Sequence, residues 1–215
     1  MSLWTSSVIS LGLLLFQTTQ VQTQRVNADS TPVPGEEIAV PAEDRPHPLA
    51  LRKRDWNLSR AYSDVFNILN SENPCSSFYG GPRSATTVLN GFVRLVKSQP
   101  LVPEVSFQME GTSRLIRDPA TGAFYRLFER IMVNTNGSFY QRRADSMDKF
   151  PSNVGTFSPG NRRARALILL HELGHLMQGE NGDWLIPDDG HDGPQSQANT
   201  LRIQQACGRQ LNTLK

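Results

Sequence analysis

The chain lacks an excess of charge of either sign and lacks a long apolar run. Its 215 residues carry 22 Lys and Arg against 20 Asp and Glu, a formal net charge of +2. Such a near-neutral balance gives no support for binding to nucleic acid or to an anionic membrane, which both select basic surfaces. A membrane-spanning helix needs about 20 apolar residues, and the apolar stretch at residues 8–16 is shorter. We therefore expect no nucleic-acid partner and no stable membrane anchor.

This short apolar stretch, followed by polar residues 17–24, is typical of a cleaved secretory signal. No Lys or Arg precedes it and no clean A-x-A site follows it; Val26-Asn27-Ala28 fits the small-residue rule best. We expect residues 1–28 to be a signal peptide and the mature protein to be soluble and secreted or periplasmic. Residues 29–55 hold five prolines and interspersed acids, which predicts a disordered linker.

Cysteine is nearly absent, since only Cys75 and Cys207 occur. In an exported protein, an even pair near opposite ends of the folded region predicts one disulfide bond rather than two buried thiols. Closing a loop of this length would stabilise the fold by up to about 4–5 kcal/mol in the chain-entropy description.

Apolar residues repeat with helical spacing in residues 58–69 and again in residues 85–96. Asn73-Pro74 and Gly80-Gly81-Pro82 are expected to break the chain between these two helices. The alternation of residues 105–109 predicts a half-buried strand.

Turn residues at positions 118–122, and Asn136-Gly137, predict strands joined by hairpins within residues 113–141. The apolar residues of 124–131 also fit helical spacing, and we favour the strand. Ser158-Pro159 predicts the N-cap and first position of a helix that ends at Gly179. A last helix is expected at residues 196–211.

The most informative feature is the HExxH motif formed by His171, Glu172 and His175. The apolar run of residues 166–170 before it indicates a buried helix. Because positions four apart project from one helix face, the two imidazoles can bind one metal ion, and Glu172 can deprotonate a metal-bound water. Three of the four histidines fall in this region, His191 being the third, which argues against a chance occurrence.

A catalytic zinc site needs a third protein ligand besides the two histidines. The final helix contains no acid, which excludes the thermolysin-like arrangement. Gln178 and Asn181 stand where the astacin-like and matrixin-like pattern requires glycine and histidine. The remaining candidates downstream of the motif are Glu180, Asp183, Asp188, Asp189, His191 and Asp192.

The position of each candidate along the chain ranks them. Glu180 would lie about 140° from the ligand face of a continued helix, and Asp183 would need a tight turn directly after it. Residues 187–192 are long enough to fold back over the metal, although such acids also occur in ordinary turns. Asp189 is our first choice, with Asp188, His191 and Asp192 as alternates.

Residues 169–207 resemble a group of exported bacterial proteins of zincin type, mostly uncharacterised. The similar features are HELGH, an I-P-x-D-G stretch at residues 186–190, an S-x-x-N-T helix start at residues 196–200, and Cys207. The resemblance covers the C-terminal quarter and is looser at residues 73–75 and 134–139. It implies a zincin-like metal site with an aspartate as third ligand and marks Asp189 as the matching position.

Taken together, these patterns predict an α+β, zincin-like fold in a domain spanning residues 56–215. A small antiparallel sheet with hairpins would pack on the HExxH helix, with two N-terminal helices and one C-terminal helix. The function expected first is a zinc-dependent endopeptidase in which His171, His175 and Asp189 hold Zn²⁺ and Glu172 is the general base for a metal-activated water.

A peptide or protein substrate would pair with a strand within residues 104–141. Tyr125, Tyr140 or a basic residue would stabilise the oxyanion, and Trp184 would wall a side-chain pocket. The alternative is an exported zinc-binding protein without turnover, its site closed by a fourth ligand such as His191. A third possibility is an interaction module with an accidental HExxH, and the sequence gives no indication of oligomeric state.

Overall fold

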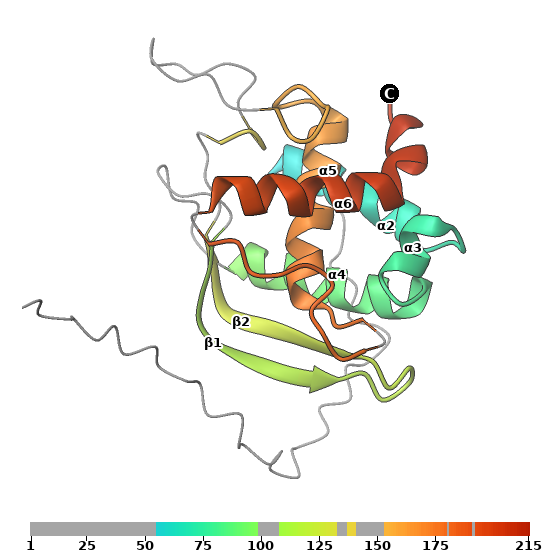
Figure 1. The fold of residues 1–215 in the computed structure, drawn as a ribbon, viewed down its shortest axis with the longest axis vertical. Coiled ribbons are helices and arrows are strands. Elements are labelled where there is room, and N and C mark those ends of the chain that lie inside the picture. Colours follow the sequence, from blue (N-terminus) through green and yellow to red (C-terminus); the bar gives the residue numbers. More distant parts are fainter. Residues whose placement is uncertain (1–54, 99–107, 133–136, 141–152, 180, 191) are drawn as a thin grey trace, which may run out of the picture. The chain divides into compact units, whose positions relative to one another are not determined.

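The HExxH motif lies on a central helix, α5, that the other elements surround (Figure 1). The structure is a computed structural model that describes residues 55–98, 108–132, 137–140, 153–179, 181–190 and 192–215. All of these belong to the compact unit Ile38–Lys215. The described residues form an α+β arrangement of five helices and one two-stranded antiparallel sheet. The elements are α2 (Trp56–Leu69), α3 (Pro74–Phe78), α4 (Pro82–Ser98), β1 (Gln108–Arg117), β2 (Phe124–Met132), α5 (Arg162–Leu176) and α6 (Gly193–Asn212).

Helix α5 contacts α2, α4, α6 and β2. Its apolar run explains this central position, because Ala166, Leu167, Leu169 and Leu170 are all fully buried and such a helix is stable only inside a core. The buried HExxH helix is therefore confirmed. Helix α6 crosses α5 in Figure 1, so the motif is covered on that side by the C-terminal helix.

The two N-terminal helices are confirmed as α2 and α4, which begin at Trp56 and Pro82. Asp55 caps α2 by accepting a hydrogen bond from the Leu58 amide, 3.1 Å away. The expected break between these helices is confirmed, since α2 ends at Leu69 and α4 begins at Pro82; Asn73-Pro74 also starts the short helix α3. Asn73 and Ser76 form a capping box there, and proline suits the first helical position because its missing N–H would have no partner.

The hairpin expected at residues 118–122 is confirmed. Gly122 donates a backbone hydrogen bond to the Asp118 carbonyl at 2.7 Å, and the strands pair with Arg117 opposite Phe124. Strand β2 settles the helix-or-strand ambiguity of residues 124–131 in favour of the strand. Residues 105–107 and 133–136 lie outside the described residues, so the start of the predicted strand and most of the second hairpin do too. Residues 137–140 form a turn, in which the Tyr140 amide donates to Gly137.

The predicted bounds of α5 are wrong at both ends. The helix begins at Arg162, capped by the side chain of Asn161, because Gly160 adopts a left-handed φ of 66° and separates the helix from Ser158-Pro159. It ends at Leu176 rather than at Gly179. Met177 is extended and pairs with Tyr125 of β2 and with Leu185, so backbone pairing replaces the expected last turn.

Three arginines in the first turns of α5 bind carbonyls and a carboxylate from distant segments. Arg162 donates to buried Asp64 of α2 at 2.6 Å, Arg163 donates to the Leu214 carbonyl at 2.9 Å, and Arg165 donates to the Phe139 carbonyl at 2.8 Å. Their charges oppose the helix dipole, and these contacts offset that cost while fastening α2 and the C-terminal residues to α5.

Helix α6 starts earlier than expected, at Gly193, because Asp192 caps it by accepting from the Gln195 amide at 3.0 Å. The predicted disulfide is confirmed: Cys75 of α3 is bonded to Cys207 of α6 across 132 residues of sequence. None of the described helices is long and apolar enough to cross a membrane. The expected signal peptide, and the linker up to residue 54, lie outside the described residues.

Candidate metal centre

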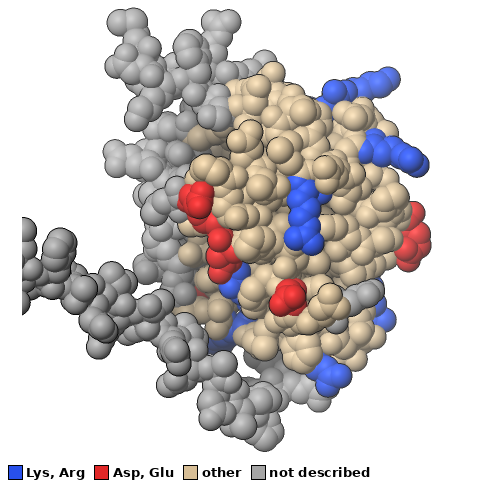
Figure 2. Space-filling view, in the orientation of Figure 1, with Lys and Arg blue, Asp and Glu red and all other residues tan. Residues whose placement is uncertain are grey.

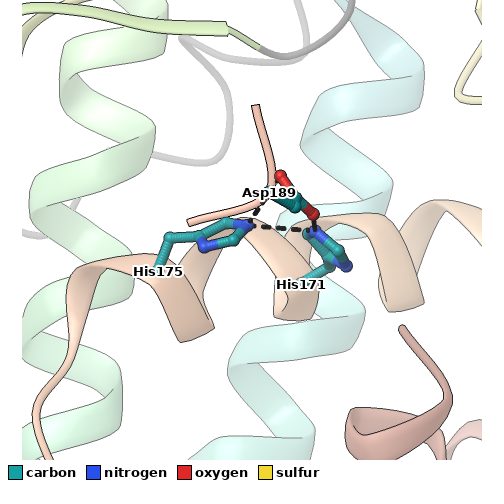
Figure 3. Close-up of side chains that lie close together, drawn as sticks. All are labelled: His171, His175 and Asp189. Carbon is teal, nitrogen blue, oxygen red and sulfur yellow. Dashed lines mark hydrogen bonds and ion pairs between the residues drawn. The ribbon is translucent and has the colours of Figure 1, made fainter. Parts of the chain in front are cut away.

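His171, His175 and Asp189 bring their ligand atoms together at the surface of α5 (Figure 3). Nε2 of His171 lies 3.0 Å from Oδ2 of Asp189 and 3.1 Å from Nε2 of His175, and Nε2 of His175 lies 3.5 Å from Oδ1 of Asp189. The two imidazoles project from successive turns, and Asp189 reaches them from the loop before α6. This buried group can hold a metal ion.

The hydrogen bonds around the group fit a cation at its centre. Nδ1 of His171 lies 2.9 Å from Oγ1 of Thr200. When Nδ1 donates to that hydroxyl, Nε2 keeps its lone pair and faces a carboxylate oxygen and a second imidazole nitrogen. Nδ1 of His175 is buried with no hydrogen-bond partner. Three acceptors that converge with few donors between them suit a cation, and two nitrogens with one oxygen form a typical zinc ligand set.

The loop that carries Asp189 is positioned by close packing against the motif helix. Ile186 is fully buried, and a Cβ added at Gly174 would lie 2.9 Å from its Cδ1 atom. Asn199 of α6 then donates from Nδ2 to the Pro187 carbonyl at 2.9 Å and approaches Oδ2 of Asp189 at 3.4 Å. The glycine inside HELGH thus lets the loop approach, and Asn199 holds the loop where Asp189 meets the histidines.

The alternate ligand candidates have other partners or lie outside the described residues. Asp188 forms an ion pair with Arg126 and is 65% exposed; its nearest approach to the histidines is 3.8 Å, from Oδ1 to Nδ1 of His175. Asp192 is the N-cap of α6, and Asp183 is exposed. His191 and Glu180 are outside the described residues.

Arg126 of β2 is a supporting residue that sequence reasoning missed. Although charged, it is 8% exposed; it donates from Nε to the His175 carbonyl at 2.7 Å and stacks on the Trp184 ring at 4.1 Å. Trp184 therefore packs on Arg126. Strand alternation gave no signal for Arg126, because the adjacent Tyr125 is also buried and Leu115, which stands opposite Arg126, is exposed. Nothing in the sequence revealed that the motif helix ends against this strand.

In the sequence, Asn199 and Thr200 belong to the stretch at residues 196–200 that resembles zincin-type proteins, and no other motif includes them. Both are buried polar residues on α6, 3% and 8% exposed. Buried polar side chains require partners, and here the partners are Asp189 and His171. Adjacent polar residues on the buried face of an otherwise amphipathic helix were the signal that could have found them.

Glu172 lies next to the histidines at the wall of a pocket. Its side chain is 9% exposed, and burial raises the pKa of Glu172 to about 7; His171 lowers this pKa, and Asp189 raises it. Burial alone would raise the pKa of Asp189, but its contacts with the imidazoles of His171 and His175 hold that pKa below its usual range. The two carboxyl groups therefore differ: Asp189 is ionised, whereas Glu172 is poised to exchange a proton near neutral pH.

The pocket beside Glu172 has a volume of about 690 Å³ and lies between α5, the start of α6 and residues of the segments 137–139 and 153–155. His171 and Glu172 form part of its wall. Neither Tyr125 nor Tyr140, the expected oxyanion donors, belongs to the pocket lining among the described residues. Tyr140 donates a hydrogen bond from its hydroxyl to Asp55, and Tyr125 is a buried residue of β2.

The described residues show no comparable concentration of charge on the face drawn in Figure 2. On the face drawn in Figure 2, Lys and Arg side chains are scattered among uncharged residues, and the described residues there form no continuous basic patch. A comparison of the chain with protein-family models, with curated proteins and with solved structures finds no match in any of the three. The geometry of the site is therefore the basis for its functional interpretation.

Proposed function

We propose that this protein is an exported zinc-dependent endopeptidase of zincin type. The observation that carries the proposal is the convergence of His171, His175 and Asp189, with Glu172 buried beside them at the wall of a pocket. The resemblance of residues 169–207 to exported zincin-type proteins supports the same assignment. The Cys75–Cys207 bond agrees with an oxidising compartment, where disulfides persist.

Each side chain has a distinct role in this proposal. His171, His175 and Asp189 hold the ion, while Thr200 and Asn199 orient His171 and Asp189. Bound zinc would supply Lewis acidity for the peptide carbonyl and for the attacking water. Glu172 receives the proton of that water on its carboxylate and passes it to the leaving amine. A structural metal site needs no such base, so the buried Glu172 favours catalysis over storage or stability.

Metal content tests the first half of the proposal. The purified chain should hold about one zinc ion per molecule by atomic spectrometry, and His171→Ala together with His175→Ala should abolish binding. Asp189→Ala should weaken zinc affinity by about tenfold or more, whereas the matched change Asp188→Ala should cost less, because Asp188 faces Arg126. Equal zinc content in the double histidine variant and the wild type would refute the metal centre.

Turnover tests the second half. A mixed peptide library, read by mass spectrometry with and without a chelator, should show cleavage by the wild type and a loss of about 10²–10⁴-fold in Glu172→Gln. That variant should keep its zinc. If both zinc-loaded proteins give one cleavage pattern, or neither cleaves anything, the protein is an exported zinc-binding protein without turnover.

A further inference from the structure

The pocket beside Glu172 has a lining that discriminates by charge. Among the described residues, its wall contains no Lys, Arg or Asp, and Glu172 is its one carboxylate. The lining instead combines apolar groups with neutral hydroxyls and amides; Phe139, Val154 and Ile168 are apolar, and Ser196, Gln197 and Thr200 are polar. An anionic group that entered this pocket would lose hydration without meeting a Lys or Arg among the described residues, and a cationic group would meet only the carboxyl of Glu172.

Ile168 connects the pocket to the proposed reaction. It lies four residues before Glu172 on α5, so both side chains project from one helix face a turn apart. A group that packs against Ile168 is therefore next to the proton-transferring carboxylate. The volume of about 690 Å³ falls within the range of roughly 300–1,000 Å³ that holds small ligands and exceeds what one aliphatic side chain fills.

The charges of the metal centre do not reverse this preference. A divalent ion held beside the carboxylates of Asp189 and Glu172 would leave the described part of the wall close to neutral, so neither a cationic nor an anionic side chain would gain from it. The rim of the pocket includes exposed Gln197, an uncharged amide on the first turns of α6. A single substitution of Gln197 can give the rim a positive or a negative charge without altering the metal ligands.

We propose that this pocket binds uncharged side chains of about aromatic size and excludes basic and acidic ones. This inference rests on the proposed peptidase function: the pocket selects peptides that have a neutral, bulky residue next to the bond that is cleaved. Tyrosine fits the chemistry of the lining, since its ring would pack on the apolar residues and its hydroxyl would reach the polar rim.

Three small probes test the pocket without requiring turnover: the N-acetyl amides of tyrosine, lysine and glutamate, titrated into the zinc-loaded chain. The tyrosine probe should shift the methyl NMR signals of Ile168 and Val154 and bind at least about tenfold more tightly than either charged probe. Gln197→Glu should bring the lysine probe into the pocket, and Gln197→Lys should do the same for the glutamate probe.

Gln205 provides the matched control, because it is an exposed glutamine on the same helix and does not line the pocket. Gln205→Glu and Gln205→Lys should leave all three affinities unchanged. The proposal is wrong if the charged probes bind the wild type as tightly as the tyrosine probe. It is equally wrong if no probe shifts the methyl signals of Ile168 and Val154. The same holds if the Gln205 variants change the probe affinities as much as the Gln197 variants do.

Hydrolysis of the peptide library, followed in parallel, separates this proposal from the proposed function. Selective binding of the tyrosine probe without any hydrolysis supports the pocket and refutes the peptidase. Hydrolysis with charged residues equally frequent beside the cleaved bond supports the peptidase and refutes the pocket.

Discussion

The imidazole of His171 is held on two sides. Its Nδ1 atom faces the Thr200 hydroxyl at 2.9 Å, and its Nε2 atom faces Asp189 at 3.0 Å. The first contact holds the orientation of the ring, and ring orientation is a property by which residues behind a metal ligand tune affinity. Thr200 therefore positions His171 in the candidate metal centre.

Replacing Thr200 should reveal that role. Thr200→Val keeps the shape but removes the hydroxyl that accepts from His171, so zinc affinity should fall by roughly 10–100-fold. Thr200→Ser restores a hydroxyl and should recover most of the loss. Competition with a zinc-binding dye measures both. If Thr200→Val binds zinc as tightly as Thr200→Ser, the hydroxyl has no influence on the site.

The buried carboxyl of Glu172 makes the metal-free protein sensitive to pH. Its pKa is about 7 in the fold, against 4.5 for an ordinary glutamate, so the folded state holds an extra proton between these values. Stability then falls as pH rises through this window, by roughly 3 kcal/mol for a shift of this size. The metal-free Glu172→Gln variant cannot ionise at this position, so its stability should not show this part of the decline with rising pH.

Urea unfolding of both metal-free proteins at pH 5 and pH 7.5 measures the difference. The stability of Glu172→Gln relative to the wild type should increase from the lower to the higher pH. Asp189 does not interfere, because its pKa is lowered, and the stability it contributes is lost at pH values below this window. Parallel pH profiles for the two proteins would contradict the raised pKa of Glu172.

Residue types and spacing predicted only part of this site. HExxH singled out His171 and His175 because helical geometry relates positions four apart. Asp189 was one of several nearby acids, and what brings it to the histidines is the packing of its loop, which no local pattern encodes. Arg126 lies 49 residues before His175 and meets it only because β2 packs against the end of α5.

Among the elements, the contact between α5 and the loop carrying Asp189 depends on one glycine. A Cβ at Gly174 would come within 2.9 Å of Ile186 and 3.3 Å of Ile203, both fully buried. Gly174→Ala should therefore displace Ile186 and lower the free energy of unfolding by about 1–3 kcal/mol, less the gain of up to about 1 kcal/mol from helix propensity. Zinc affinity should fall with it.

Gly208 of α6 is the control for this change, since a Cβ there meets nothing within 4 Å. Gly208→Ala should be neutral or should stabilise the protein by up to about 1 kcal/mol, with zinc affinity unchanged. Chemical denaturation and zinc titration of both variants measure the contrast. Equal effects of the two substitutions would show that close packing at Gly174 does not set the position of the loop.

Element types followed from the sequence more reliably than element ends. The apolar periodicity predicted α2, α4 and α6, and the turn residues predicted the hairpin. The ends of α5 were misplaced because Ser158-Pro159 looks like a helix start, whereas Asn161 supplies the actual cap. The end at Leu176 depends on pairing between Met177 and Tyr125, a tertiary contact that helix signals cannot anticipate.

At the scale of the whole molecule, the disulfide joins two helices, α3 and α6, that lie close to the candidate metal centre. Cys207 lies two turns after Thr200 on α6, and Cys75 lies on α3. Tyr79, directly after α3, donates its buried hydroxyl to the Leu170 carbonyl at 2.6 Å, one residue before His171. Residues near both cysteines thus contact the turn of α5 that carries His171, Tyr79 through Leu170 and Thr200 through His171 itself. We therefore expect the disulfide to influence the geometry of the site.

Removing the disulfide should therefore weaken metal binding as well as stability. Cys75→Ala combined with Cys207→Ala should lower the free energy of unfolding by up to about 4–5 kcal/mol. It should also reduce zinc affinity under conditions where circular dichroism shows the fold to be intact, because Thr200 and Asn199 lose their fixed position.

Asp64→Asn breaks the ion pair between α2 and Arg162, away from the site, and serves as a destabilised control whose zinc affinity should not change. If both variants lose stability but bind zinc as tightly as the wild type, the disulfide does not act on the site. Zinc affinity that falls only in the double cysteine variant would mean that the centre assembles best after the disulfide has formed.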